Sequence, residues 1–148
     1  SRIVMQLFRK LAPRAVENFR CLCSGEKGKS ENGTLLHYKG TIIHRVCRGF
    51  VMQGGDVVYR FRSSLTVQSI YGGMFPDENL GSRHIDFGQV CMANTGQKDS
   101  NGCQFYITFD GAPWLDGDNV IIGKVRMIKV SRCSSTREGD VCYRFCEG

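Results

Sequence analysis

The stretch IIHRVCRGFVMQGGD, residues 42–56, carries the clearest structural signal in the chain. It predicts two short strands, Ile42–Cys47 and Phe50–Gln53, joined by a tight connection at Arg48-Gly49. The double glycine at 54–55 ends the second strand, because glycine pairs of this kind mark turns. Two short strands with so brief a connection indicate antiparallel β-structure.

Other segments with strand character lie on both sides of this pair. Residues 3–8 show the period of two that is typical of a strand. Further strands are expected at residues 89–93, 104–108, 120–125 and 141–145. With 18 glycines and only three prolines, the composition is that of a turn-rich β protein. We expect a mainly β fold, a closed or nearly closed barrel capped by helices, because closure removes exposed strand edges.

The main helix signal follows the first strand. Pro13 suits a first helical turn, apolar residues recur at helical spacing from Val16 to Cys23, and Ser24-Gly25 ends the run. A second, short helix is predicted at Met127–Cys133. Residues 57–87 have no clean period and contain turn signals, so we expect a long surface excursion of the functional kind.

Length and composition indicate one globular domain over residues 1–148. The 148 residues fit a single domain of roughly 100 to 200 residues, and 41% hydrophobic and 23% charged content is ordinary. Apolar runs such as Val120–Ile122 are far shorter than the ~20 residues of a membrane span, and Ser1-Arg2 opens without a secretory signal. The net charge is +6, but no block of like charges forms a nucleic-acid arm.

The eight cysteines, at positions 21, 23, 47, 91, 103, 133, 142 and 146, do not follow a zinc pattern. Only Cys21-x-Cys23 and Cys142-x3-Cys146 are closely spaced, and the three histidines are far apart. Several cysteines lie where a strand calls for a small apolar residue, as in Val90-Cys91-Met92. We expect reduced core thiols, with disulfides as the alternative, and therefore a cytoplasmic or nuclear location.

The sequence contains none of the usual parts for hydrolysis or phosphoryl transfer. It has no G-x-S-x-G motif, no glycine-rich phosphate loop and no evident pair of nucleophile and base. Instead, polar groups lie among apolar and aromatic residues. Alternation along a strand would turn Arg45 toward a groove lined by Phe50, Tyr106, Trp114 and Leu115.

Several short motifs follow one another over roughly residues 2–125. They are Glu17–Phe19, Cys23–Gly28, His44–Val46, Gly49-Phe50, Gln53–Asp56, Ser69–Gly72, Asp77–Asn79, Met92–Asn94, Asn101–Phe105 and Trp114–Gly117. In this order they resemble the cyclophilin family of peptidyl-prolyl cis/trans isomerases. The resemblance implies an eight-stranded antiparallel barrel closed by two helices, with the substrate groove on its outer face.

The same resemblance implies that Arg45, Phe50 and Gln53 are catalytic. Rotation about a peptide bond meets a barrier of ~18–20 kcal/mol, and the prolyl nitrogen regains a lone pair in the twisted state. A guanidinium that donates to this nitrogen favours the twisted state, which is the implied role of Arg45. Gln53 would orient the arginine. The implied substrate-binding residues are His44, Val51, Ala93, Asn94, Gln104, Tyr106, Trp114, Leu115 and Asn119.

The implied partners are proline-containing peptides and proteins, together with a cyclosporin-type ligand that would contact Trp114. Rotation of a peptide bond cleaves nothing and calls for no acid, base or nucleophile, and we expect neither a cofactor nor a metal. We also expect a monomer that binds no membrane.

Several positions depart from the family pattern. Val51 stands where the family usually has methionine, Tyr106 where it has phenylalanine, and Asn119 where it has histidine. The stretch 57–68 lacks glycine where the family carries a glycine-rich loop, and the turn at 96–100 is about one residue longer. In the family pattern a further strand precedes the segment that begins here at Arg2, and the stretch that corresponds to Arg126–Cys146 is several residues longer.

Three hypotheses about function remain open. The first is an active prolyl isomerase that assists folding or switches partner proteins. The second keeps the fold but only binds proline-containing segments, because the altered loop and the changes at Val51 and Asn119 reduce turnover. The third is a basic interaction protein that relies on Arg60, Arg62, Arg83, Arg126, Lys129 and Arg132.

Overall fold

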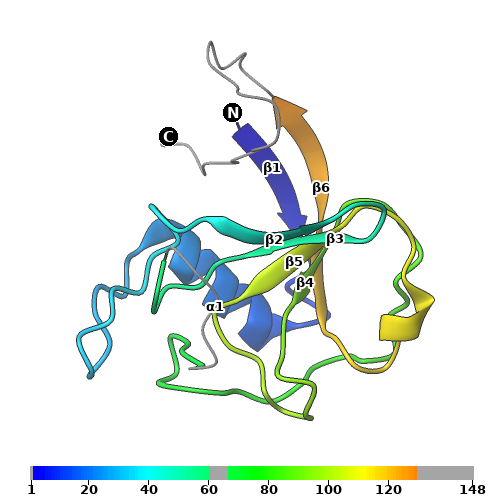
Figure 1. The fold of residues 1–148 in the computed structure, drawn as a ribbon. Helices are drawn as coiled ribbons and strands as arrows, with labels where there is room; N and C mark the ends of the chain where they lie inside the picture. Colours follow the sequence, from blue (N-terminus) through cyan, green and yellow to red (C-terminus); the bar gives the residue numbers. More distant parts are fainter. Residues whose placement is uncertain (1, 61–66, 130–148) are drawn as a thin grey trace.

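The computed structural model describes residues 2–60 and 67–129, which contain six strands, one α-helix and one short 3-10 helix (Figure 1). The strands are β1 (Arg2–Leu7), β2 (Ile43–Cys47), β3 (Val51–Gly54), β4 (Gln89–Met92), β5 (Phe105–Thr108) and β6 (Ile121–Lys129). Helix α1 spans Pro13–Ser24, and the 3-10 helix η1 spans Pro113–Leu115.

All six strands belong to one antiparallel sheet, in the order β1-β6-β4-β5-β3-β2. Strands β1 and β2 form its two edges and do not pair with each other. The expectation of a closed eight-stranded barrel with two helices is therefore wrong for the described residues, which hold an open six-stranded sheet and a single α-helix. Closure would need backbone hydrogen bonds between the two edge strands, and β1 and β2 form none. The strand predicted at residues 141–145 lies outside the described residues.

The local pattern located most elements correctly, with one exception at the end of the sheet. The predicted helix at Met127–Cys133 is wrong for its first three residues, because Met127–Lys129 continue β6. There they pair with β1, with Val4 opposite Met127 and Arg2 opposite Lys129. The ladder of backbone hydrogen bonds to β1 outweighs the local helical spacing, and residues 130–133 lie outside the described part.

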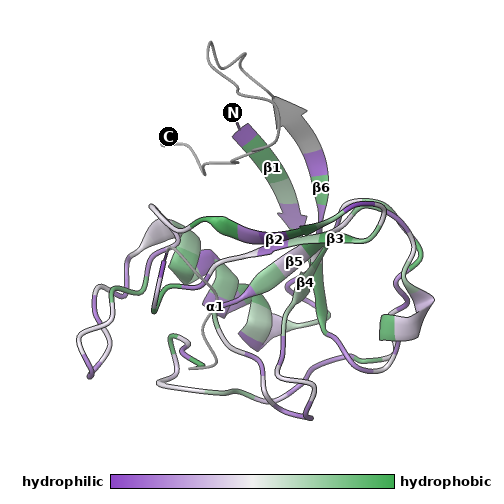
Figure 2. Ribbon diagram, in the orientation of Figure 1, coloured by the Kyte–Doolittle hydropathy of each residue, from purple (hydrophilic) through white to green (hydrophobic). Residues whose placement is uncertain are grey.

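Side-chain alternation gives the sheet two different faces. Met52 of β3 and Phe105 of β5 enter the main hydrophobic core, whereas their neighbours Val51 and Tyr106 belong to a smaller cluster on the opposite face. Figure 2 shows hydrophobic residues along the strands and on α1. Helix α1 covers the main core with four buried apolar side chains, Ala15, Val16, Phe19 and Leu22. The candidate site lies on the other face.

The start of α1 is completed by the long excursion that precedes β4. No side chain of the flanking residues caps the helix, but the two oxygens of Glu78 accept hydrogen bonds from the backbone N–H groups of Arg14 (3.1 Å) and Ala15 (2.8 Å). Asn18, fully buried in the helix, accepts a 3.0 Å hydrogen bond from the backbone N–H of Ile70. These contacts fix the excursion against the helix, so the segment from 67 to 87 is ordered without regular secondary structure.

Three of the cysteines are core residues. Cys21, Cys91 and Cys103 are buried, which confirms the apolar context predicted for Cys91. Burial raises the pKa of Cys91 to about 12 and that of Cys103 to about 11. Both thiols are therefore protonated at neutral pH and are poor nucleophiles. Cys133, Cys142 and Cys146 lie outside the described residues.

An aromatic cluster joins α1 to the sheet. The rings of Phe19, Tyr38 and Phe105 lie with their centroids 5.2 to 5.4 Å apart. Gly55 adopts a φ of +84°, and a Cβ at this position would lie 2.7 Å from Phe105 and 2.8 Å from Tyr38. Glycine is therefore needed at position 55 for two reasons: it adopts the left-handed backbone conformation without strain, and it leaves room for the rings of Phe105 and Tyr38.

Substitution of this glycine tests the packing. Gly55→Ala should lower the free energy of unfolding by about 2–4 kcal/mol, because a left-handed alanine and an overpacked contact both cost free energy. The matched control is Gly49→Ala, with a φ of +70° and no atom within 4 Å of the added Cβ. It should cost only about 1–2 kcal/mol. Denaturant titration measures both, and equal losses would show that the aromatic contacts do not limit the packing.

Candidate functional site

A row of side chains crosses the sheet on the face opposite the main core. Arg45 of β2 lies opposite Gln53 of β3, Gln53 lies opposite Tyr106 of β5, and Tyr106 lies opposite Cys91 of β4. Directly opposed residues of antiparallel strands project from the same face of a sheet. The register therefore places Arg45, Gln53 and Tyr106 on the same face of the sheet.

An apolar floor lies beside this row. Val51, Cys91, Tyr106 and Ile121 form a buried cluster. The partly buried side chains packed against it are Phe8, Phe50, Ala93 and Leu115. Trp114 remains 63% exposed, and its ring centroid lies 5.5 Å from that of Phe50. The site thus has a hydrophobic floor and an aromatic rim that is open to solvent.

Hydrogen bonds hold the polar side of the row. The Gln53 amide donates to Gln104 Oε1 at 2.9 Å, and the Gln104 amide donates to Asp56 Oδ2 at 3.2 Å. Asp56 is buried, and its other carboxylate oxygen accepts hydrogen bonds from the backbone N–H groups of Val58 and Tyr59. The sequence pattern assigned no role to Asp56, although it closes the Gln-Gly-Gly-Asp motif.

Arg45 has a different environment from these neighbours. Its side chain is exposed on the edge strand β2, and its guanidinium makes no hydrogen bond or ion pair with any of the described residues. A guanidinium carries five N–H donors, so those of Arg45 are available to a bound molecule on this face.

Two loops close the other side of the site. Asn94 donates to the backbone oxygen of Asp118 at 2.7 Å, and Asn119 donates to that of Met92 at 3.1 Å. Ala93 and Gln104 are also joined, through their backbones. Between these loops lies a pocket of about 490 Å³, lined by Asp77, Asn94, Thr95, Gly96, Gln97, Lys98, Leu115, Gly117, Asp118 and Asn119. Three of the predicted binding residues therefore line a real cavity.

Beneath Tyr106 lie two residues that the sequence analysis missed. The Tyr106 hydroxyl is 3.2 Å from His84 Nε2, and His84 Nδ1 is 3.0 Å from Asp116 Oδ1. His84 is fully buried, and its backbone N–H donates to the same Asp116 oxygen at 2.6 Å. These hydrogen bonds lower the pKa of Asp116, and burial raises that of Tyr106. The available signal was a tyrosine within a buried strand, because a buried hydroxyl needs a partner.

His44 is a predicted site residue whose side chain makes no hydrogen bond to the other described residues. It lies on β2 where the pairing with β3 is irregular, and both of its ring nitrogens are buried without a hydrogen-bond partner among the described residues. Burial lowers the pKa of its imidazole. No hydrogen bond joins it to the described part of the site, so its role in substrate binding stays a prediction.

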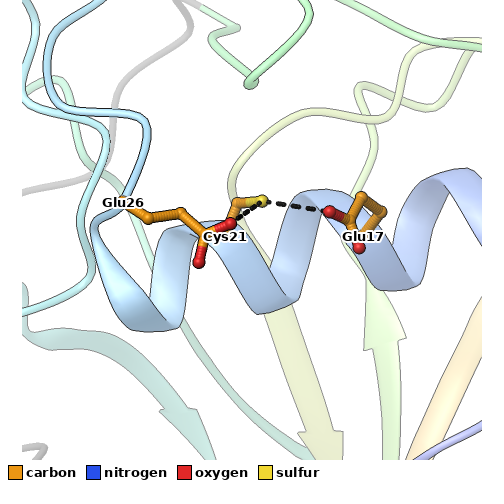
Figure 3. A group of neighbouring side chains, drawn as sticks. All are labelled: Glu17, Cys21 and Glu26. Atoms are coloured by element: carbon orange, nitrogen blue, oxygen red, sulfur yellow. Dashed lines mark hydrogen bonds between the residues drawn. The ribbon is translucent and has the colours of Figure 1, made fainter.

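A separate group of possible metal ligands lies on α1 and the turn that follows it, away from this face. The ligand atoms of Glu17, Cys21 and Glu26 are within 4.8 Å of one another (Figure 3). Arg20, however, pairs with Glu17 at 2.8 Å and with Glu26 at 2.6 Å. These bonds lower the pKa of both carboxyls to about 2, and burial raises that of Cys21 to about 11. The Arg20 guanidinium therefore already neutralises the two carboxylates that a metal ion would need as ligands.

The basic residues proposed for an interaction surface are largely engaged within the chain. The Arg60 guanidinium donates to the backbone oxygens of Leu35, His37 and Lys39. Arg83 pairs with Asp116 at 3.5 Å, and Arg126 donates to the side chain of Gln6. Arg62 and Arg132 lie outside the described residues, as does the side chain of Lys129. The described part offers little support for a dedicated basic surface.

Comparisons with known proteins agree with this geometry. The model of the cyclophilin type peptidyl-prolyl cis-trans isomerase/CLD family matches residues 1–131. Peptidyl-prolyl cis-trans isomerase CYP21-1 of Arabidopsis thaliana is 55% identical over 124 residues, which are 84% of this chain and 54% of that protein. The chain belongs to the cyclophilin family, and it spans about half the length of this relative. Within the described residues, no helix is long and apolar enough to cross a membrane.

The group around Arg20 predicts a loss of stability in acid. Since the pKa values of Glu17 and Glu26 fall from 4.5 to about 2 on folding, their contribution is complete above 4.5 and is lost as the pH falls toward 2. Glu17→Gln/Glu26→Gln should flatten the dependence of unfolding free energy on pH in this window, as measured by urea titration. The control Glu31→Gln removes an exposed carboxylate of the next loop and should keep the wild-type slope. An unchanged slope in the double variant would contradict the pairing.

Proposed function

We propose that this chain catalyses cis/trans rotation about X-Pro peptide bonds. The observation that carries the proposal is the row in which Arg45 lies opposite Gln53 and Gln53 lies opposite Tyr106, in a chain of the cyclophilin family. Among the described residues, the Arg45 guanidinium has no hydrogen-bond or ion-pair partner. The reaction cleaves no bond and requires only the loss of amide resonance, so it calls for neither a nucleophile nor a base.

In the proposed mechanism, Arg45 is the electrostatic element. As the peptide bond twists, resonance is lost and the prolyl nitrogen becomes a hydrogen-bond acceptor. The guanidinium donates to it more strongly in the twisted state than in either planar state, which lowers the barrier. Gln53 lies opposite Arg45 in the strand pairing and is held by its hydrogen bond to Gln104, and it would limit the orientations of the arginine.

The apolar cluster would hold the proline ring while the preceding carbonyl swings. Phe50, Val51, Tyr106 and Leu115 supply its walls, and all four belong to the cluster or pack against it. Valine is shorter and stiffer than methionine, so the pocket keeps its apolar character with a different depth. Asn119 already donates to a backbone oxygen and so acts as a wall of the pocket.

The remaining predicted residues would line the peptide on either side of the proline. The assignment of Ala93, Asn94 and Gln104 to the peptide backbone follows the family pattern. Ala93 and Gln104 are joined through their backbones, and the Asn94 amide donates to the backbone oxygen of Asp118. The assignment of His44 rests on the family resemblance alone. We further propose a monomer in a reducing compartment, cytoplasmic or nuclear, because the buried thiols of Cys91 and Cys103 serve as core residues.

A second function, binding of proline segments with weak turnover, is favoured by the changed residues Val51 and Asn119 at the pocket. A tetrapeptide isomerisation assay at low temperature distinguishes the two. Peptide binding without acceleration of isomerisation would support the binding module, whereas acceleration supports the enzyme.

Substitution of Arg45 tests the mechanism. Arg45→Ala should lower kcat/KM about ten- to two-hundred-fold, since a charged hydrogen bond contributes about 1.5–3 kcal/mol. Arg45→Lys should recover little, because lysine lacks the planar fork of donors. The matched control is Arg48→Ala, which removes the same charge from the exposed turn of the same hairpin and should retain activity. Near-normal kcat/KM in Arg45→Ala would refute the mechanism.

We also propose that a cyclosporin-type macrocycle binds at the aromatic rim, more weakly than in relatives with the usual pocket. Trp114 is the single tryptophan and is exposed beside Phe50, so its fluorescence reports binding directly. A saturable change in emission that a proline-containing peptide competes away is the expected result. No change at high micromolar ligand would contradict the proposal.

A further inference from the structure

A chain of hydrogen bonds runs from Tyr106, in the buried apolar cluster of the site, through His84 to Asp116, the residue that follows Leu115. Tyr106 belongs to β5, and Leu115, which packs against the same apolar cluster, is followed directly by Asp116. His84 lies between them, 3.2 Å from the Tyr106 hydroxyl and 3.0 Å from the Asp116 carboxylate. Its ring is nearly parallel to that of Tyr106, with the planes 24° apart and the centroids 6.4 Å apart.

The direction of each proton in this chain follows from the donors and acceptors present. Asp116 as a carboxylate only accepts, so His84 Nδ1 carries a hydrogen and donates it. In the neutral imidazole, Nε2 is then an acceptor, and the Tyr106 hydroxyl donates to it. With this tautomer, all three groups have a hydrogen-bond partner.

Backbone contacts hold His84 in the same position. Its N–H donates to Asp116 at 2.6 Å, and its carbonyl accepts a 2.8 Å hydrogen bond from the N–H of Ala112, at the start of η1. The ring is fully buried, and Tyr106 is only 5% exposed. A side chain held at both ends in this way cannot change rotamer without leaving buried polar atoms unpaired.

We propose that His84 is a positioning residue for the proline pocket: through the Tyr106 hydroxyl and Asp116 it fixes the distance between the Tyr106 ring and Leu115. The proposal rests on the proposed function, because the two walls matter for turnover only if they hold a proline. The proline ring must stay in contact with both side chains while the peptide bond is twisted. Displacement of either side chain by about 1 Å can lower the rate up to a hundredfold.

Three variants distinguish the Tyr106–His84 hydrogen bond from the His84–Asp116 hydrogen bond. Tyr106→Phe removes only the hydroxyl, His84→Asn keeps a donor toward Asp116, and the double variant combines them. Each single variant should lower kcat about three- to tenfold with a smaller change in KM. The double variant should lose no more than the worse single variant, because both changes break one hydrogen bond. The control Tyr71→Phe removes an exposed hydroxyl that donates to the backbone oxygen of Arg14. It should leave kcat unchanged.

A measurement independent of activity keeps this proposal separate from the proposed function. In the wild type, the ¹⁵N resonances of His84 should show a protonated Nδ1 and an acceptor Nε2, and the Leu115 methyl shifts should move in Tyr106→Phe but not in Tyr71→Phe. If the wild type is inactive but these shifts occur, the proposed function fails and the pocket is still held by His84. Unmoved Leu115 methyls, or additive losses in the double variant, would overturn the proposal.

Discussion

The antiparallel pairing of β3 with β5 determines where nearly every group of the site lies. Because Gln53 is opposite Tyr106, Val51 and Tyr106 belong to the cluster on the site face, while Met52 and Phe105 enter the main core. A slip of one residue on either strand would reverse these assignments and bury a polar amide. The packing of Phe105 in the aromatic cluster excludes such a slip, so the core on one face sets the geometry of the other.

Most of the fold could be predicted from local patterns, since strands of period two and a helix with a proline start and a glycine end have short-range signals. The strand pair at 42–47 and 50–53 differs from β2 and β3 by a single residue at each affected boundary. The end of β6 could not be predicted, because Met127–Lys129 are strand only through their pairing with β1 from the opposite end of the chain. Barrel closure was inferred from the number of strands and from resemblance, neither of which fixes how edges meet.

The site was predictable where it depends on alternation and motifs, and unpredictable where it depends on folding of irregular segments. Arg45, Gln53 and Tyr106 share a row because strand residues keep their faces. His84 and Asp116 lie in segments without a period, and only the tertiary structure brings one against the other. The spacing of the histidines along the chain does not predict the role of His84, because its partners Tyr106 and Asp116 are distant from it in the sequence.

The capping of α1 by Glu78 also affects how the helix opens. A helix that lacks its own cap normally frays from its first turn, and its leading amides exchange with solvent at the rate of that fraying. Here the backbone N–H groups of Arg14 and Ala15 donate to the carboxylate of Glu78, which belongs to another segment. Their hydrogen exchange therefore reports the detachment of the excursion from the helix, which makes two amides far from the site a probe of the loop's local stability.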